Sequence, residues 1–367
     1  MCSRMNKLYV LVVLFAFSDI KSSDLIKVKI NSPTKKIRLS STKEMEVSLL
    51  GRETKKSKKM VVNCDFSNRQ VFSKNLLASV ESSVPISFNG KTFKGRFDII
   101  ARRRGGCELI NTVEIENYVS SLLSKEMNSK WPVEALKAQA VAARSYALAK
   151  RSKNIFSTYH IESSEREQVS GSYGEQNLNT DLAAYMTKDL VLADKKNKLV
   201  EAYYHAMCGG KIFNPNDIWN GEFSGFEKQR CKYCNKFKKG GYEEVISEKE
   251  LLNSLEKIGF KFKKIISLTN TDSLILVRGK SEGNQIETKK ILKKDLRRKL
   301  NRSKVKSFNF NINKIGNQFY LKGHGHGHGV GMCQMGALAM AQEGKTYKEI
   351  LKYYYPNFKI ISKGELK

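Results

Sequence analysis

The sequence is short of long apolar segments, internal repeats and acidic residues. Apart from Leu8–Phe17, no apolar run is long enough to cross a bilayer, and the 367 residues contain no repeat and no low-complexity linker. Only 36 Asp and Glu stand against 66 Lys and Arg, which leaves a net charge of +30. These shortages exclude a multi-span membrane protein and a repeat array. They favour a globular protein with a polyanionic or acidic partner.

The first 18 residues have the pattern of a secretory signal peptide. Arg4 and Lys7 form a basic start, Leu8–Phe17 is an apolar run, and the small residues Ala16 and Ser18 suit a signal peptidase. As a helix the run would rise roughly 15 Å, about half of a bilayer core. We therefore expect cleavage after residue 18 and export to the periplasm, the cell wall or the outer face of the membrane. A buried N-terminal element and an uncleaved anchor are the alternatives.

Export narrows the choice of partner that the positive charge implies. Only Arg4 and Lys7 leave with the signal peptide, so the mature chain would still carry about +28. An exported protein does not meet DNA or RNA in the cytosol, so we expect no nucleic-acid partner. The expected partner is an anionic wall polymer or an anionic membrane surface.

Cysteine usage points to pairing or to a metal. Six cysteines remain after Cys2 leaves with the signal peptide, and an even number in an exported protein suggests disulfides. They are Cys64, Cys107, Cys208, Cys231, Cys234 and Cys333. One group has zinc-like spacing, because His205-x-x-Cys208 precedes Cys231-x-x-Cys234. A zinc site and a disulfide from Cys208 to Cys231 or Cys234 both remain open.

Residues 24–112 are predicted to be β-rich, and residues 113–362 to form a second, partly helical part. Short β-branched or alternating runs occur at Ile26–Ile30, Met45–Leu50 and Phe97–Ile100, and the Lys-rich segment Lys55–Lys59 is predicted as a turn. Further elements expected later in the chain are a hairpin around Asp194-Lys195 and helices over Ser247–Ile258, Lys289–Leu300, Cys333–Gln342 and Tyr347–Tyr354.

Two helices are predicted to meet at a polar corner between Glu116 and Lys150. The apolar residues before the corner fall on one helical face: Ile115, Tyr118, Val119, Leu122 and Leu123. Asn128-Ser129 breaks that pattern, and Pro132 then suits the first turn of a second helix. The segment from Pro132 to Lys150 has seven alanines and no glycine. So many small side chains predict a helix that packs closely on several faces.

Glu126 stands at this corner and is the candidate general acid. It continues the apolar face of the first helix, so its side chain points inward or to the rim. Partial burial, the nearby Trp131 and the helix C-terminus all predict a raised carboxyl pKa, as proton donation near neutral pH requires. The alternative is an exposed glutamate that pairs with Lys125 or Lys130.

Arg144 lies in the middle of the alanine-rich helix, where an arginine needs an acceptor. The acceptor is either a carboxylate of a substrate or one of the protein itself. Lys137 and Gln139 on the same helix are predicted to face solvent.

The segment Gly323–Gly331 has glycine at every second position and histidine at His324, His326 and His328. Alternating glycines let a backbone approach a ligand closely. If the run is extended, the three histidines share one face and could bind a metal. The helix expected after it could hold an anion at its N-terminus.

Three separated blocks resemble the SpoIID/LytB family, named after stage II sporulation protein D and an autolysin modifier. The first is Tyr118 with the run SKEMNSKWPVEALKAQAVAARSYAL, which ends at Leu148. The second is AYYHAMCGG from Ala202 to Gly210, with Trp219 after it. The third is HGVGMCQMGA from His328, followed by EILKYYYP up to Pro356. The blocks occur in the family's order, and the resemblance spans about residues 26–360.

The resemblance implies an exported peptidoglycan lytic transglycosylase with an α+β fold: a β-rich scaffold, a helical catalytic block and a long substrate groove. Such an enzyme cuts the MurNAc–GlcNAc β-1,4 bond and leaves a 1,6-anhydro product. The resemblance makes Glu126 the catalytic acid and then base. The expected substrate-binding residues are Arg144, His328, Gln334, Tyr204 and Trp131, and Glu126 and the His328 loop should line one groove.

The resemblance also sets expectations for partners and cofactors. Peptidoglycan glycan strands are the expected partner, and no cofactor is required unless His205, Cys208, Cys231 and Cys234 bind zinc. Some relatives hold a metal shortly after the catalytic block, but residues 160–174 contain no cysteine here, so that site is not carried over. The alternative function is a non-catalytic wall-binding protein that localises or activates another hydrolase.

Overall fold

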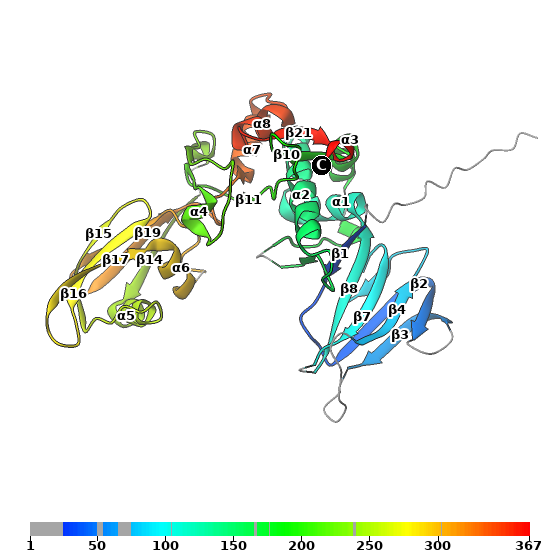
Figure 1. Cartoon of the computed structure of the whole chain (residues 1–367), viewed down its shortest axis with the longest axis horizontal. Coiled ribbons are helices and arrows are strands. Elements are labelled where there is room, and N and C mark those ends of the chain that lie inside the picture. The colour runs from blue at the N-terminus through cyan, green and yellow to red at the C-terminus, as the bar shows by residue number, and fades with distance from the viewer. Residues whose placement is uncertain are drawn as a thin grey trace, which may run out of the picture.

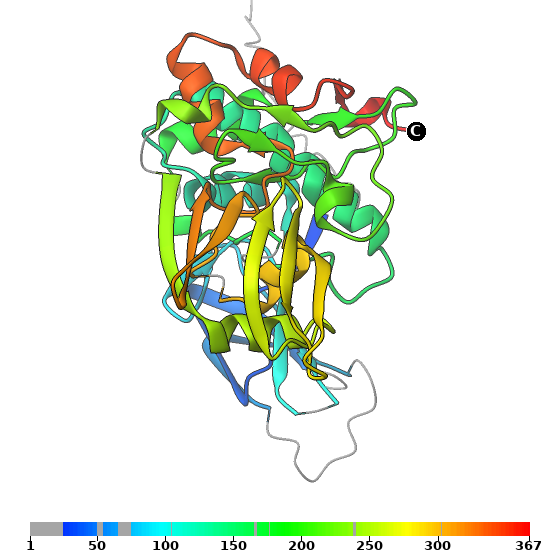
Figure 2. The same cartoon turned by 90° about the vertical axis from the view of Figure 1, so that its left-hand side faces the viewer.

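The computed structural model describes residues 25–49, 54–64, 75–103, 105–164, 167–175, 177–237, 240–301 and 303–367. The expected signal peptide lies outside these residues. The described chain forms a helical part with two β-rich arms that hang from it, and the two arms are apart from one another (Figure 1). Figure 2, a view from the side of the later arm, shows the helices along one end with both β-rich arms below them. The predicted mixed, β-rich α+β fold class is confirmed.

The first arm is a nine-stranded sheet with the order β6-β5-β2-β4-β7-β8-β1-β9, and β3 pairs with β2. Neighbouring strands are antiparallel except β1 and β9, which are parallel. The strands are β1 (Leu25–Lys29), β2 (Lys36–Leu49), β3 (Lys55–Asn63), β4 (Asn75–Glu81), β5 (Ile86–Phe88), β6 (Lys91–Phe93), β7 (Arg96–Ala101), β8 (Cys107–Glu114) and β9 (Ile161–Glu162). A disulfide joins Cys64, just after β3, to Cys107 at the start of β8.

The prediction of a turn at Lys55–Lys59 is wrong, because these residues begin β3. This strand pairs with β2 alone, so one of its edges has no strand partner among the described residues. Lysines suit such an edge, since charged side chains oppose pairing with a further strand from another molecule. The lysines of Lys55–Lys59 therefore indicate an edge strand and not a turn between strands.

The helical part is built around α2, which is buried along most of its length from Ala135 to Ala149. The helices α1, α3, α7 and α8 pack against it, as its alanine content predicted. The helices are α1 (Ile115–Glu126), α2 (Val133–Lys153), α3 (Leu178–Met186), α4 (Pro215–Ile218), α5 (Glu248–Glu256), α6 (Lys293–Lys299), α7 (Gln334–Gln342) and α8 (Tyr347–Tyr354). Short 3-10 helices occur at η2 (Tyr173–Glu175), η3 (Cys234–Lys236) and η5 (Lys363–Glu365). No helix in the described ranges is long and apolar enough to span a membrane.

Short strand pairs connect distant segments across the helical part. β10 (Leu190–Ala193) pairs with β21 (Lys359–Ser362), β11 (Tyr204–His205) with β20 (Met332–Cys333), and β12 (Lys211–Ile212) with β13 (Gln229–Arg230). The hairpin predicted around Asp194-Lys195 is present only as a short antiparallel turn, and the longer partner of β10 is β21. A single bridge joins Ala193 to Leu199 across that turn, while the strand itself uses the C-terminal end of the chain as partner.

The second arm is an insertion between the cysteine-containing loop and the His-Gly segment. It has two three-stranded sheets, in the orders β14-β19-β18 and β15-β16-β17, with α5 and α6 packed against them. Its strands are β14 (Gly241–Ser247), β15 (Lys264–Asn270), β16 (Leu274–Lys280), β17 (Ile286–Leu292), β18 (Phe310–Ile315) and β19 (Gln318–His324). It encloses a hydrophobic core of its own, with Ile246, Ile275 and Phe319 at its centre. The arm begins and ends beside the loops that carry the candidate site.

Candidate active site

Glu126 is the last residue of α1 and lies half-buried at the corner between α1 and α2. Its Oε1 accepts a hydrogen bond from the backbone N–H of Val169 at 3.4 Å, and its Oε2 accepts one from Nε2 of Gln334 at 3.4 Å. Burial raises the pKa of the Glu126 carboxyl above its usual value, although both hydrogen bonds act in the opposite direction. A raised pKa was predicted from the sequence, and the dominant cause is burial.

The segment that carries Val169 passes in direct contact with α1. A Cβ atom at Gly171 would lie 1.8 Å from the carbonyl oxygen of Ser121. Any other residue at Gly171 would therefore push the segment away from α1. Its glycine allows the close approach that brings the Val169 N–H within reach of Glu126.

Gln168 connects α1 with β11 next to Glu126. This fully buried residue accepts a hydrogen bond from the Tyr118 hydroxyl at 2.9 Å and donates from Nε2 to the Tyr204 hydroxyl at 3.0 Å. Tyr118 belongs to α1 and Tyr204 to β11. The charge of Glu126 is one of the causes that raise the pKa of both tyrosines, after burial. Sequence reasoning missed Gln168, because a polar residue in an irregular segment has no periodic pattern to mark it.

Gln139 of α2 completes the polar surroundings of Gln334. Its Oε1 accepts a hydrogen bond from Gln334 Nε2 at 3.4 Å, and its side chain is fully buried. The prediction that Gln139 and Lys137 face solvent is wrong. Lys137 is 8% exposed and pairs with Glu134 at 2.7 Å. Other helices cover α2 on most sides. A polar side chain on this helix therefore does not have to face solvent.

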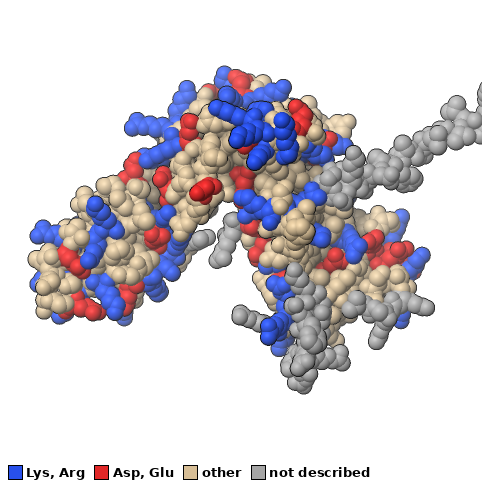
Figure 3. Space-filling view, in the orientation of Figure 1, with Lys and Arg blue, Asp and Glu red and all other residues tan. Residues whose placement is uncertain are grey.

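A pocket of about 260 Å³ adjoins this corner. It is lined by Tyr146, Lys150, Glu167, Glu201, Tyr203, Tyr204, Trp219, Phe223 and His328. Aromatic rings form one wall: the ring centroids of Tyr203 and Trp219 are 4.6 Å apart, and those of Trp219 and His328 are 5.0 Å apart. Tyr204 belongs to the pocket and also to the Gln168 network, so it joins the pocket to the surroundings of Glu126. In Figure 3 the molecule is hollowed between the two arms.

Charged groups on the opposite wall are paired with one another. Lys150 lies 3.4 Å from Glu167 and 3.2 Å from Glu201. Burial alone would raise the pKa of the Glu201 carboxyl, but hydrogen bonds and charge from Lys153 and Lys150 bring it below its usual value. The carboxyls of Glu126 and Glu201 thus have opposite pKa shifts, a pattern that separates an acid from a permanent anion.

His328 lines the pocket, as the sequence blocks suggested. Its pKa is lowered to about 3, first by burial and then by the neighbouring His205, so its ring is neutral at neutral pH. The expectation of an extended run with three histidines on one face is wrong. Gly325–Gly331 has a positive φ at every glycine, from 67° to 109°, which turns the chain at every second residue. Within the described chain, His324, His326 and His328 do not gather as metal donors.

Arg144 and Trp131 do not line the pocket. Arg144 is fully buried and makes a two-point contact with Glu116, with Nε to Oε1 at 2.9 Å and Nη2 to Oε2 at 2.6 Å. Its other donors reach the carbonyl oxygens of Leu190 and Ala184. The acceptor of Arg144 is therefore a carboxylate of the protein itself, and its side chain is not exposed to a substrate. This corrects its assignment to substrate binding. Trp131 is half-buried against the hydrophobic core between α1 and α2.

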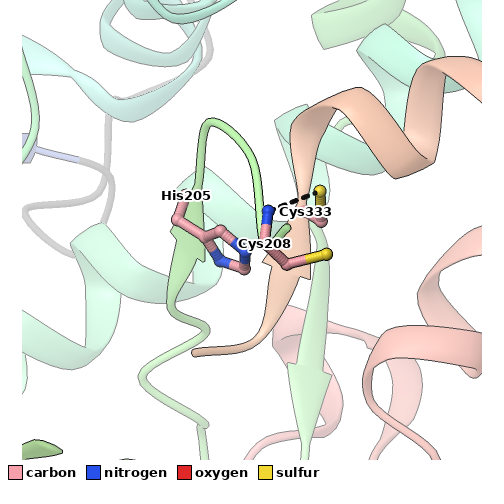
Figure 4. A group of neighbouring side chains, drawn as sticks. All are labelled: His205, Cys208 and Cys333. Carbon is pink, nitrogen blue, oxygen red and sulfur yellow. Dashed lines mark hydrogen bonds between the residues drawn. The ribbon is translucent and has the colours of Figure 1, made fainter. Parts of the chain in front are cut away.

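The predicted cluster of His205, Cys208, Cys231 and Cys234 is brought together, and Cys333 joins it. His205, Cys208 and Cys333 have donor atoms within 4.8 Å of one another (Figure 4). All four cysteines are buried with free thiols, so of the two alternatives the disulfide from Cys208 to Cys231 or Cys234 is not formed. Sequence reasoning missed Cys333, although the even cysteine count left it without an assigned partner.

The prediction that Glu126 and the His328 loop line one groove remains a prediction, because Glu126 is not among the residues that line the His328 pocket, although the two are linked through neighbouring residues. Gln334, six positions after His328, contacts Glu126 directly, and Tyr204 shares a pocket with His328 while it bonds to Gln168. The three sequence blocks thus converge on one corner, through Glu126, Tyr204 and Gln334.

Comparison with known proteins agrees with this convergence. A family model described as "Stage II sporulation protein" matches residues 103–193. An uncharacterised protein of Brachyspira hyodysenteriae is 32% identical over 255 residues, which cover 69% of this chain and 68% of that protein. Stage II sporulation protein D of Bacillus subtilis is 27% identical over 309 residues, 77% of this chain and 86% of that protein. A B. subtilis protein named amidase enhancer is 26% identical over 294 residues, 66% of this chain and 40% of that protein.

Proposed function

The chain belongs to the stage II sporulation protein D family, and from that premise we propose that it is an exported lytic transglycosylase of peptidoglycan. It acts outside the cytoplasm on glycan strands and cleaves the bond between MurNAc and GlcNAc. The observation that carries the proposal is the raised pKa of Glu126, in a polar corner where all three sequence blocks meet. The positive charge of the chain suits an anionic wall polymer.

Glu126 acts first as an acid and then as a base. In its protonated form it donates a proton to the glycosidic oxygen, the bond from that oxygen to C1 of MurNAc breaks, and the GlcNAc part leaves as an alcohol. The Glu126 carboxylate then accepts the proton of the MurNAc C6 hydroxyl, whose oxygen bonds to C1 and closes the 1,6-anhydro ring. Glu126 ends protonated and no water is consumed, so one carboxyl is enough where ordinary glycosidases use two.

The electrostatics of the corner favour Glu126 over Glu201 as the proton donor. A donor must hold its proton near the working pH, and burial favours the neutral form of Glu126. Glu201 remains an anion because Lys150 and Lys153 lower its pKa. Its negative charge on the pocket wall suits the positive charge that develops at C1 during bond cleavage.

The aromatic wall of the pocket suits the apolar faces of sugar rings. Tyr203, Trp219 and Phe223 form a continuous aromatic surface, with Trp219 in contact with both neighbours. Pockets of this kind combine aromatic area with a few polar groups that fix orientation. Lys150, which is paired with Glu167 and Glu201, completes a set of polar groups on the pocket wall that suits the hydroxyl groups of a sugar.

The proposal is tested by digestion of peptide-free glycan strands, with mass spectrometry of the products. Wild-type protein should release fragments that end in 1,6-anhydro-MurNAc, and Glu126→Gln should lower that release at least about 100-fold. Glu282→Gln, at an exposed turn of the second arm, is the matched control and should behave as wild type. Wild-type products with reducing ends only, or equal anhydro release by Glu126→Gln, would contradict the proposal.

A second candidate is a wall-binding protein that stimulates a separate hydrolase, which the name of the amidase enhancer relative favours. In that case the purified chain would bind wall sacculi without dissolving them and would accelerate an added amidase. Glu126→Gln would stimulate that amidase as well as wild type does. Loss of stimulation together with loss of anhydro product in Glu126→Gln would instead assign both effects to the glycan cleavage.

A further inference from the structure

Four cysteines from three distant segments of the chain meet in the core of the helical part. Cys208 follows β11, Cys231 and Cys234 flank the turn before η3, and Cys333 ends β20. Each is at most 2% exposed, and all four thiols are free. The disulfide of the described chain is in the first arm, between Cys64 and Cys107.

The four sulfur atoms contact one another as a single group. Donor atoms of Cys208, Cys333 and His205 lie within 4.8 Å of one another, and both of these cysteines also interact with Cys231 and Cys234. Each sulfur thus has at least two sulfur neighbours. Two separate disulfides would divide the cysteines into two pairs. A shared contact among four thiols is the arrangement of a tetrahedral metal site, in which every ligand faces one centre.

Backbone N–H groups are directed at these sulfur atoms. Cys333 Sγ accepts hydrogen bonds from the N–H of Cys208 and of Gly336, each at 3.3 Å. Cys234 accepts from the N–H groups of Gly209 and Gly210, and Cys231 accepts from the N–H of Cys234. Such donors stabilise thiolate over thiol and are the usual outer partners of metal-bound cysteine. Four cysteine thiolates around one metal would carry a charge that the cation offsets.

His205 gives a second, independent observation at the same place. It stands directly opposite Cys333 in the pair of β11 with β20, and its ring lies next to Cys208 (Figure 4). Its Nδ1 is 3.0 Å from the carbonyl oxygen of Val330, while its buried Nε2 has no hydrogen-bond partner among the described residues. A buried nitrogen without a partner beside a group of sulfurs is expected where a cation binds, and it makes His205 the alternative to one of the thiolates as a ligand.

We propose that Cys208, Cys231, Cys234 and Cys333 bind one zinc ion as a structural four-thiolate site, with His205 packed beside it. Zinc suits four thiolates in tetrahedral geometry, and it undergoes no redox change. The ion would connect the loop after β11, the loop before η3 and the N-terminus of α7. Gln334 follows Cys333 directly and contacts Glu126, so the same ion would hold the third sequence block in register with the first.

The test uses the full chain, purified without chelator or added thiol. Elemental analysis should find about one zinc per molecule, and X-ray absorption should find about four sulfur neighbours at roughly 2.3 Å. A chelator should make the four thiols of the native protein open to alkylation at Cys208, Cys231, Cys234 and Cys333. A shell of three sulfurs and one nitrogen would overturn the four-thiolate assignment in favour of His205 as a ligand.

Matched variants separate the zinc site from the disulfide. Cys333→Ser and Cys234→Ser should lower zinc content at least about tenfold, whereas the double variant Cys64→Ser/Cys107→Ser should retain it, because that pair lies in the first arm. Metal-free wild-type protein with disulfides among the four cysteines would overturn the proposal. So would wild-type alkylation that is the same with and without chelator, a result that does not depend on any variant folding.

Discussion

Gln334 Nε2 lies 3.4 Å from Glu126 Oε2, and this contact joins residues 208 positions apart in the chain. Gln334 is the first residue of α7 and Glu126 the last of α1. The same amide also reaches Gln139 of α2. The carboxyl proposed as acid is therefore positioned by a residue from the far end of the sequence, and its pKa depends on that contact.

Gln334→Ala should shift the alkaline limb of the pH–activity profile to higher pH. The hydrogen bond from Gln334 lowers the pKa of Glu126, so its loss raises that pKa further and keeps the acid form present at higher pH. Maximal activity should fall, because the carboxyl also loses a positioning contact. Anhydro product is measured across a pH series, with exposed Gln285→Ala as control. A limb that stays in place or moves to lower pH would contradict the assigned role of Gln334.

Glu126→Gln should be more stable than wild type at pH 7.5, by roughly one or two degrees in melting temperature. A raised pKa means that the folded protein holds this proton more tightly than the unfolded chain does. Ionisation of Glu126 therefore destabilises the fold as pH rises from the unfolded-state pKa, about 4.3, through the folded-state value. The difference from wild type should vanish near pH 4. An equal difference at both pH values would show that charge is not its cause.

Arg144→Lys should destabilise the protein by about 3 kcal/mol without a change in substrate affinity. Breaking a buried ion pair costs roughly 3–5 kcal/mol, and the partial exposure of Glu116 places this pair at the lower end. Lysine also cannot reproduce the two-point contact with Glu116. Unfolding by denaturant measures the loss, and activity per folded molecule should be retained at low temperature. A raised KM with unchanged stability would instead return Arg144 to the substrate surface.

Trp219→Ala should raise the KM for glycan roughly tenfold, with little change in kcat. Loss of one large aromatic contact corresponds to about 1–1.5 kcal/mol of binding. The variant Phe156→Ala removes an aromatic ring that is 96% exposed and outside the pocket, so it serves as the control. Steady-state release from glycan strands of defined length measures both constants. An unchanged KM would exclude the aromatic wall from substrate binding.

Local patterns predicted many of the elements well. The apolar stripe Ile115–Leu123 is buried as expected, and α7 and α8 begin and end within one residue of their predicted bounds. The partial burial and raised pKa of Glu126 were also predicted, because a helix-end glutamate that continues an apolar face points inward or to the rim. Periodicity and composition report on interactions between residues close together in the sequence. Helix bounds and the buried face of a helix depend mainly on such local interactions.

The sequence by itself determined the two helices that meet at Glu126, the excess of positive charge and the zinc-like spacing of His205, Cys208, Cys231 and Cys234. Only the tertiary structure decided that Gln139 is buried, that Arg144 pairs with Glu116, that β10 uses β21 as partner and that Cys333 joins the group of Cys208, Cys231 and Cys234. Each of these depends on contacts between residues far apart in the chain. Local residue patterns do not predict which distant residues come into contact. The packing of whole helices and strands against one another determines those contacts.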